Sequence, residues 1–392
     1  MLTTELAPWP SFTDEEADAV RQVLLSNKVN YWTGEHGRLF EQEFAAFCDC
    51  DYAVAVANGT LALDAALQAL ELGAGDEVIV PPRTFIATVS AVVNAGATPV
   101  FADVDLNSQN LSADTIAPMI GPNTKAIVVV HLAGMPAEMD AIMALANQHG
   151  LWVIEDCAQA HGARYQGRSV GSFGHVAAWS FCQDKIMTTG GEGGMVTTRD
   201  EALWQRLWSL KDHGKSFDAV YHQSHPPGFR WLHHSFGHNW RMTEMQAVLG
   251  RIQLQRMPEW SARRRQLAAE LDKAVASLPL LRQVQVPEDA IHACYKHYFF
   301  VRTELLAEGW SRDRLCDALM AAGVPCYQGS CSEVYLEQAF ANTPWRPAQP
   351  LPNARELGET SLMLLVHPTI SEQQIEFCAQ QLAIVVAQAS KT

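Results

Sequence analysis

The sequence predicts an α/β protein: a large, mostly parallel sheet followed by a smaller C-terminal α+β domain. Two observations carry this prediction. Short apolar runs rich in β-branched residues recur through the first 200 residues, and helical patterns separate the early runs. Such alternation is typical of a parallel sheet covered by helices on both faces. Beyond about residue 200 the pattern changes to long helices with few strands.

The first half supplies the strands of the large sheet. The apolar runs lie at residues 52–58, 76–82, 98–104, 125–131, 151–157, 175–181 and 193–199. Helical patterns lie between the early runs, at residues 60–73, 87–96 and 139–150. Each ends on a glycine (Gly73, Gly96 and Gly150), the residue that most often follows a helix C-terminus.

The second half predicts the smaller domain. A long amphipathic helix is expected near residues 243–277, after a turn-rich segment with many histidines and tryptophans. A strand near 297–303 and helices near 311–322 and 371–388 complete the pattern. We therefore place a large domain with a short N-terminal arm at 1–250 and a small domain at 251–392, with the boundary inside or beside the long helix.

Composition narrows the class of protein. The 392 residues are 48% hydrophobic, enough for a large core, and the net charge of -15 has the wrong sign for binding nucleic acid. The first 20 residues lack the features of a signal peptide, and no apolar run reaches the roughly 18 residues of a membrane span. Nine cysteines without CxxC pairing indicate free thiols in a reducing compartment. These features predict a soluble, cytoplasmic protein without a membrane partner.

Two predicted strands lead into chemically useful residues. One strand ends at Asp156, and the strand at 175–181 is followed by Lys185 and a glycine-rich stretch. Ligands of open α/β sheets bind at the carboxyl ends of the strands. A carboxylate there can pair with a protonated ring nitrogen, and a lysine can form a Schiff base. Separately, each residue is as well explained as a capping Asp or a solvated Lys, but the two together favour a cofactor site.

Three further stretches are candidates. Asn58-Gly59-Thr60 links a strand to a helix, where free N–H groups suit a phosphate. Phe85 follows another strand and could stack on a flat ring, although a core Phe is the default reading. Asn239 and Arg241 precede the long helix and could contact phosphate or a carboxylate, or could simply be solvated.

In this order, the stretches resemble the DegT/DnrJ/StrS family of sugar aminotransferases. The segments that carry the resemblance are NGTLAL (58–63), GDEVIVPPRTF (75–85), GATPVFADVD (96–105), TKAIVVVHLAG (124–134), VIEDCAQAHGA (153–163), SFCQDKIMTTGGEGG (180–194), FGHNWRMTEMQAVLG (236–250) and HPTISEQQIE (367–376). The resemblance is strong over residues 10 to 255 and weaker beyond them.

The resemblance implies a pyridoxal-phosphate (PLP) transferase of fold type I, similar to aspartate aminotransferase. Lys185 would carry the cofactor as a Schiff base and move protons, and Asp156 would pair with the pyridine nitrogen. By the same resemblance, the remaining cofactor contacts are Gly59, Thr60 and Ser180 at the phosphate, Phe85 on the ring face, Gln159 beside the ring hydroxyl, and Asn239 donated by the second subunit of a homodimer. Substrate contacts are Arg241, His367, Tyr31 and Trp32.

The implied reaction moves an amino group, with L-glutamate as donor, to a keto group of a nucleotide-linked deoxysugar for cell-surface polysaccharide or secondary-metabolite sugars. The family's dehydratase branch carries histidine in place of the lysine, so Lys185 favours transamination. The run TTGGEGG at 188–194 is one Gly longer than the family's usual TTGEGG, which indicates a different loop path. The acceptor sugar, the keto position and the nucleotide carrier do not follow from the sequence.

Two other functions remain open at this point: a PLP-dependent lyase or dehydratase, and a PLP-binding regulator without turnover. The histidines of residues 221–240 match no regular zinc spacing, so no metal site is expected.

Overall fold

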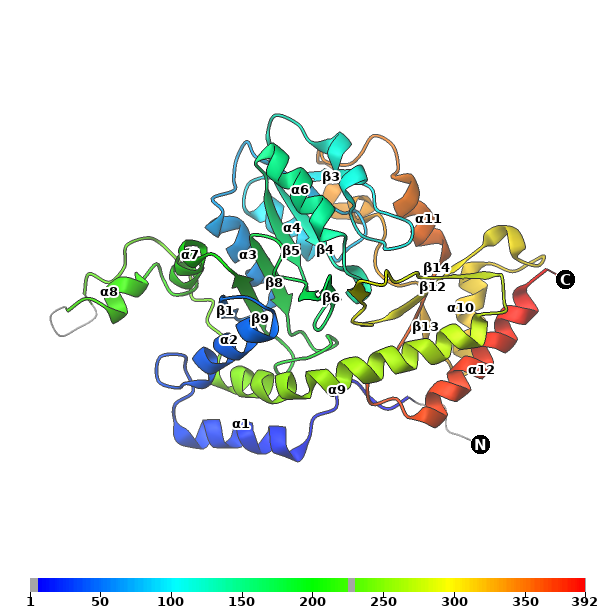
Figure 1. Ribbon diagram of the computed structural model, residues 1–392, viewed down its shortest axis with the longest axis horizontal. Helices are drawn as coiled ribbons and strands as arrows, with labels where there is room; N and C mark the ends of the chain where they lie inside the picture. The colour runs from blue at the N-terminus through cyan, green and yellow to red at the C-terminus, as the bar shows by residue number, and fades with distance from the viewer. Residues whose placement is uncertain (1–5, 225–229, 392) are drawn as a thin grey trace.

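A seven-stranded sheet forms the centre of the computed structural model, which describes residues 6–224 and 230–391 (Figure 1). Its strand order is β1-β9-β8-β5-β4-β2-β3. The strands are β1 (Tyr52–Val56), β2 (Glu77–Val80), β3 (Thr98–Phe101), β4 (Thr124–Val130), β5 (Trp152–Asp156), β8 (Val176–Ser180) and β9 (Gly194–Thr198). Neighbours from β8 to β3 pair in parallel, whereas β9 runs antiparallel to both β8 and β1. The predicted large, mostly parallel sheet is confirmed.

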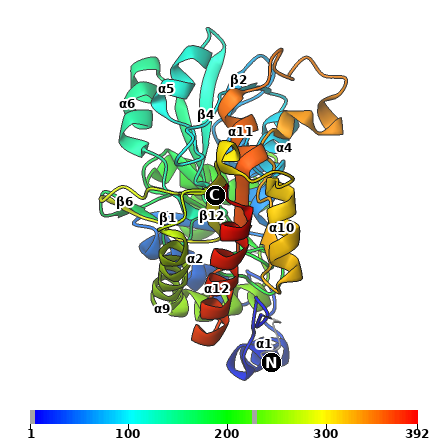
Figure 2. The same cartoon turned by 90° about the vertical axis from the view of Figure 1, so that its right-hand side faces the viewer.

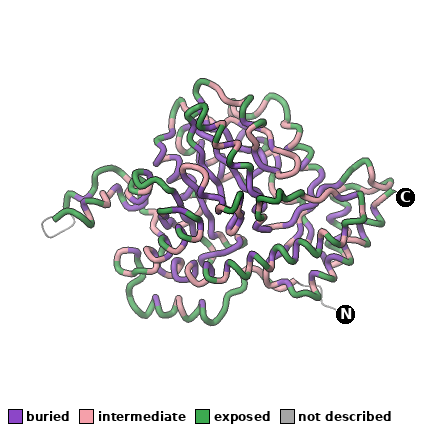
Figure 3. The backbone as a smooth tube through the Cα atoms, viewed as in Figure 1, coloured by how far each residue is buried: buried purple, intermediate pink, exposed green. Residues whose placement is uncertain are grey.

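Helices cover both faces of this sheet, because its strands are apolar on both sides. One face packs against α3 (Gly59–Ala69), α4 (Ala87–Asn94) and α7 (Glu201–Lys211). The other packs against α2 (His36–Phe47), the first half of α9 (Glu244–Val275) and α6 (Met139–His149), with the short α5 (Ala113–Ile116) beside α6. The buried backbone in the middle of Figure 3 is this layered core.

Helix α9 runs from beneath the large sheet to the C-terminal part of the chain (Figures 1 and 2). Its second half packs with a four-stranded antiparallel sheet and two helices around a second core. The sheet order is β10-β12-β14-β13, and the elements are β10 (Leu281–Gln283), β12 (His297–Val301), β13 (Cys326–Tyr327), β14 (Ser361–Leu364), α10 (Arg312–Ala321) and α12 (Glu372–Ala389).

Residue 250 falls inside α9, so the boundary between 1–250 and 251–392 remains a prediction. Several later residues also pack against the large sheet. Val334, Tyr335 and Phe340 belong to the core on one of its faces, and α11 (Pro352–Thr360) packs on the other. A small sheet of β11 (Ala290–Ile291), β6 (Arg164–Tyr165) and β7 (Arg168–Ser169) links the two halves as well.

The N-terminal arm crosses to the small domain before α1 (Asp14–Ser26) begins. Leu6 packs on the core of the small domain, and α1 lies along α9. At the opposite end, a segment containing α8 (Phe217–Tyr221) projects from the large domain (Figure 1). None of the described helices is long and apolar enough to cross a membrane. All nine cysteines are unpaired.

One helix end differs from its prediction. The helix expected over 60–73 ends at Ala69, and Glu71 instead of Gly73 takes the left-handed conformation, with φ at 58°. The chain turns early because Leu70 and Leu72 are both buried in the core. Gly96 and Gly150 have positive φ as expected after α4 and α6.

Candidate active site

The sheet brings the separated motifs to one edge. The carboxyl ends of the parallel strands and the start of the antiparallel β9 lie at the same side of the sheet. Asp156 is level with Val130 of β4 and Ala178 of β8, and Ser180 is level with Gly194. Gly194 in turn pairs with Val56, directly before the turn into α3. This is the strand edge at which α/β sheets bind ligands.

The turn before α3 is shaped for a phosphate. The Asn58 side chain accepts a hydrogen bond from the Leu61 N–H, so the N–H groups of Gly59 and Thr60 remain at the positive end of the helix dipole. A Cβ atom on Gly59 would lie 2.5 Å from Cβ of Ser180. The absence of a side chain at Gly59 therefore lets the helix start touch the Ser180 strand end, which brings the Ser180 hydroxyl beside the first residues of α3.

Asp156 lies buried at the same strand edge, and two donors fix its carboxylate. The Thr88 hydroxyl donates to Oδ2 at 2.8 Å, and the Ala158 N–H donates to Oδ1 at 3.1 Å. Burial raises the pKa of Asp156, while these hydrogen bonds and the charge of Lys185 act in the opposite direction. A cation bound beside Asp156 would favour its ionised form further, because opposite charges lower a carboxyl pKa. The site therefore suits a protonated ring nitrogen.

Lys185 lies half-buried in the loop after β8. Its Nζ lies 5.2 Å from the centre of the Tyr295 ring, and its carbonyl accepts a hydrogen bond of 2.8 Å from Trp9 Nε1. Trp9 comes from the N-terminal arm, and Tyr295 follows α9 and packs in the core on one face of the large sheet, so segments distant in the chain meet at this lysine. Sequence reasoning missed both aromatic residues, because no local pattern links them to Lys185.

The glycine-rich loop after Lys185 contains the extra residue expected from TTGGEGG. Gly190 and Gly191 have φ of 88° and 119°, a conformation that side chains disfavour. A Cβ on Gly190 would approach Leu249 of α9 to 2.9 Å, whereas one on Gly191 would meet nothing within 4 Å.

Gln159 and Phe85 lie at the same strand edge. Gln159 Oε1 accepts a hydrogen bond of 2.7 Å from the Ala133 N–H, which leaves its NH2 group for another acceptor. Phe85 is 68% exposed although it is a large hydrophobic residue at the end of a buried segment. An exposed aromatic face in this position is free to stack on a flat ring.

Arg241 lies next to the phosphate turn. Its backbone pairs with Val56, and its Nη1 donates to Asp212 Oδ1 at 2.6 Å. Its Nε is buried without a partner among the described residues. The neighbouring Asn239 is exposed.

The other residues expected to bind substrate are packed against neighbouring side chains. Tyr31 is 2% exposed, and its hydroxyl donates to Glu41 Oε2 at 2.9 Å. Trp32 packs edge-on against Trp208. His367 is buried and stacks on Trp9, and burial lowers its pKa to about 3. Tyr31 and His367 are therefore buried against other side chains, whereas Arg241 borders the phosphate turn directly.

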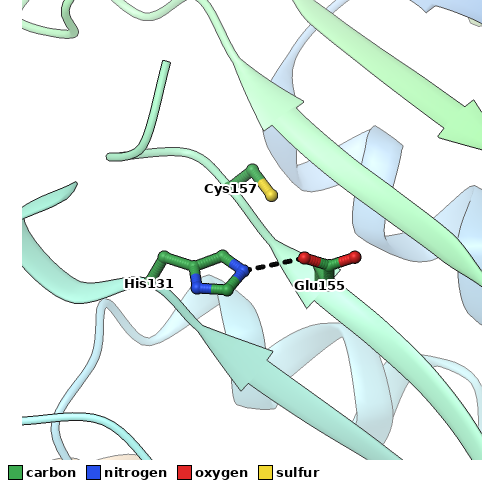
Figure 4. A group of neighbouring side chains, drawn as sticks. All are labelled: His131, Glu155 and Cys157. Carbon is green, nitrogen blue, oxygen red and sulfur yellow. Dashed lines mark hydrogen bonds and ion pairs between the residues drawn. The ribbon is translucent and has the colours of Figure 1, made fainter. Parts of the chain in front are cut away.

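Glu155 and Cys157, the chain neighbours of Asp156, form a buried group with His131 (Figure 4). His131 Nδ1 accepts from the Ala137 N–H at 3.0 Å, so its Nε2 carries the proton and donates to Glu155 at 2.9 Å. Glu155 also accepts from the N–H groups of Gly171, Phe173 and Gly174. Because these bonds already occupy the imidazole and the carboxylate, the group fits a structural role. Of the histidines considered in residues 221–240, His225 lies outside the described residues.

Together these residues fit PLP: a helix start for a phosphate, a buried carboxylate for a ring nitrogen, an exposed aromatic face and a lysine at the same edge. Fold and site define the class of PLP-dependent aminotransferases of fold type I. The chain belongs to the DegT/DnrJ/EryC1/StrS aminotransferase family, which it matches over residues 10–383. Enzymes of this family are PLP-dependent, and so is this one.

Individual relatives cover nearly the whole chain. A UDP-N-acetyl-3-dehydro-alpha-D-glucosamine 3-aminotransferase of Acidithiobacillus ferrooxidans is 39% identical, over 92% of this chain and 91% of the relative. GDP-perosamine synthase of Escherichia coli O157:H7 is 35% identical, over 95% and 96%. The crystal structure of an aminotransferase from Psychrobacter cryohalolentis is similar with a TM-score of 0.97 and 60% identity, over 98% of this chain and all of that one.

Proposed function

We propose that this enzyme transfers an amino group from L-glutamate to a keto group of a nucleotide-linked deoxysugar. The product would serve cell-surface polysaccharide, such as O-antigen, or secondary-metabolite sugars. The observation that carries the proposal is the meeting of Lys185, Asp156 and the Gly59 turn at one strand edge. The relatives named above act on UDP- and GDP-linked sugars, which supports a nucleotide sugar as acceptor.

The proposed roles follow the geometry. PLP, when bound, supplies an electron sink that stabilises negative charge next to the reacting nitrogen. Lys185 Nζ would hold the cofactor and, when released from it, would act as the acid–base group that takes a proton from the carbon of the bound donor and, in the second half-reaction, gives one to the carbon of the acceptor. Asp156 keeps the ring nitrogen protonated, Phe85 stacks on the ring, and the Gln159 NH2 donates to the ring hydroxyl.

The remaining contacts hold the phosphate and the substrate. Gly59, Thr60 and Ser180 bind the phosphate. Arg241 binds a substrate anion next to that turn, and Trp32, Tyr31 and His367 shape the walls around it.

A Lys185→Ala variant tests this assignment. The variant should lack the absorbance of the lysine-bound cofactor and should lose turnover, because no other group replaces the amine at that position. Lys125→Ala, at an exposed position of β4, is the matched control and should behave like wild type. Wild-type turnover in Lys185→Ala would overturn the assignment. Ammonia release from an amino sugar without a second substrate would indicate a lyase instead.

We also propose that the enzyme is a cytoplasmic homodimer with shared active sites, in which Asn239 reaches the partner's phosphate site. The projecting segment exposes Trp231 at 84% and Phe236 at 100%. Exposed aromatic residues of this size are typical of protein interfaces. The unpaired cysteines support a reducing compartment.

Complementation tests the shared site. If Asn239 serves the partner, mixing inactive Lys185→Ala with an Asn239→Ala variant should restore activity, because each mixed dimer then has one intact site. Light scattering should give twice the chain mass. A monomeric mass, or no gain on mixing, would contradict the proposal.

A further inference from the structure

A small cavity beside Lys185 carries an inference beyond the cofactor site. The cavity measures about 440 Å³ and lies between residues 6–9 of the N-terminal arm and the small domain. Its wall is mainly apolar, and its polar residues are Asp184, Lys296 and His367. Asp184 accepts a hydrogen bond from the hydroxyl of Tyr295, whose ring Lys185 also faces, so this wall of the cavity lies near the loop of the reacting lysine.

Lys296 and Lys185 face the same ring. The Lys296 ammonium lies 4.7 Å from the centre of the Tyr295 ring and the Lys185 ammonium 5.2 Å from it. The two nitrogen atoms therefore lie within about 10 Å of each other, since each is in cation–π range of one ring. A small molecule that reacts at Lys185 can reach Lys296 with a second functional group.

A second cation stands behind the cavity wall. Arg264 of α9 is 1% exposed, lies 5.0 Å from the Trp9 ring and donates only to the Tyr295 carbonyl, at 3.3 Å. Its Nε and Nη2 are buried without a partner among the described residues. Burying a guanidinium without a partner is energetically costly, and no carboxylate of the described residues balances the positive charge of Arg264.

The two charged residues of the cavity lining balance each other, so, apart from Lys185, the excess of one positive charge comes from Arg264 behind the wall. Lys296 and Arg264 are cations, and Asp184, which accepts from the Tyr295 hydroxyl, is the carboxylate. His367 is neutral near pH 7, because burial lowers its pKa to about 3. One bound carboxylate would balance the excess, whereas a diphosphate would overcompensate it.

We propose that this cavity is the subsite for a carboxylate of the amino donor, with Lys296 as its direct ligand and Arg264 as a positioning charge behind it. The inference rests on the proposed transamination, and it adds the residues that recognise the donor. The apolar wall, which includes residues of the arm and Met320, suits the carbon chain of a small dicarboxylic amino acid.

Glutarate is the probe, because it carries two carboxylates but no amine and cannot react. Calorimetric titration of the PLP-loaded enzyme should show glutarate binding. Lys296→Met should lower the affinity for glutarate at least about tenfold, because a charge-assisted hydrogen bond is lost. Lys296→Arg keeps that bond, so its affinity should stay within a few-fold of wild type. Lys273→Met, at an exposed position of the same helix as Arg264, is the matched control and should bind like wild type.

Other outcomes overturn the inference. Glutarate affinity unchanged in Lys296→Met, or no glutarate binding by wild type, would exclude the subsite. If Lys296→Met instead weakens whichever of UDP, GDP and dTDP the wild type binds best, and leaves glutarate unaffected, the cavity holds the nucleotide phosphates. Intact cofactor absorbance in each variant shows that the protein is folded.

The two proposals fail separately. Glutarate binding does not require turnover, so the subsite can be tested even if L-glutamate leaves the cofactor spectrum unchanged, which would refute the proposed donor. Conversely, if glutamate converts the wild-type cofactor but Lys296→Met reacts at the same apparent affinity, only the subsite is refuted.

Discussion

Gly59 shows how the absence of one side chain shapes the phosphate turn. Only hydrogen fits between the start of α3 and Ser180, so both can approach the same anion. Sequence reasoning found this residue because a small turn before a helix is a local signal. It could not identify the neighbour that makes the glycine necessary, since Ser180 lies on another strand.

A Gly59→Ala variant should bind PLP at least about tenfold more weakly and lose about 1–3 kcal/mol of stability, because the added methyl group overlaps Ser180. Cofactor titration by absorbance and urea unfolding measure the two effects. Gly73→Ala is the control, since a Cβ there would lie 3.6 Å from its nearest neighbour. Equal PLP affinity in the two variants would contradict the proposed contact.

His161 is a buried residue whose two ring nitrogens have no partner among the described residues. Its ring lies among Phe44, Trp179 and Phe181. Burial lowers its pKa to about 3, with the charges of Lys185 and Arg264 acting in the same direction. Between pH 6.5 and 3 the unfolded chain therefore binds a proton that the folded chain does not, so stability falls as the pH falls through this range.

Replacing His161 with Phe should remove this part of the pH dependence. When the pH is lowered from 7.5 to 5, the free energy of unfolding of wild type should fall by about 2 kcal/mol more than that of His161→Phe. The difference arises over the roughly 1.5 pH units between the unfolded-state pKa of 6.5 and pH 5. Urea unfolding at both pH values gives the difference. His149→Phe, at an exposed position, should keep the wild-type dependence. Parallel curves for wild type and His161→Phe would refute a neutral buried His161.

At the scale of elements, Glu155 ties three segments together. It sits in β5 next to Asp156. Its carboxylate accepts a hydrogen bond from His131, which follows β4, and further hydrogen bonds from backbone N–H groups of the loop at 171–174. Burial raises the pKa of Glu155, but the opposing hydrogen bonds and the His131 interaction leave it below its usual value. The carboxylate thus fixes the strand ends that present Asp156.

Glu155→Gln should destabilise the protein by about 3 kcal/mol or more, because an amide group would turn N–H donors toward N–H donors in a buried site. Chemical unfolding measures the loss of stability. If Asp156 is displaced as well, the cofactor absorbance that develops when PLP is added should be weaker than in wild type. Glu138→Gln, exposed just before α6, should change stability by less than about 0.5 kcal/mol. Wild-type stability in Glu155→Gln would show that the four bonds contribute little.

At the scale of the whole molecule, the site is assembled from both halves of the chain. The arm supplies Trp9, the ends of β5 and β8 lead into Asp156 and Lys185, and the chain after α9 supplies Tyr295. A ligand that binds at this junction stabilises the folded state as a whole, by an amount set by its concentration relative to Kd.

Removing PLP should therefore lower the Tm by several degrees. Adding PLP at about 100 times Kd should raise the free energy of unfolding again by about 2.7 kcal/mol. Differential scanning calorimetry of the stripped and reloaded enzyme measures the shift. Pyridoxal without its phosphate should restore less, because the turn at Gly59 stays empty. A Tm that is independent of PLP would contradict a cofactor site at this junction.

The sequence by itself determined the strands of the large sheet and the helices between its early strands, and it singled out Lys185 and Asp156 at the strand ends. These signals are local: periodicity, turn residues and strand ends act over a few neighbouring residues, and a parallel sheet brings the carboxyl ends of its strands to one edge. The tertiary structure alone decided which distant residues join them. Trp9 reaches Lys185 across 176 positions, Tyr31 turns inward to Glu41, and Lys296 lines a cavity whose Trp9 wall lies against Arg264. Such contacts depend on how the arm and the small domain pack on the large sheet, and no local pattern in the chain encodes that packing.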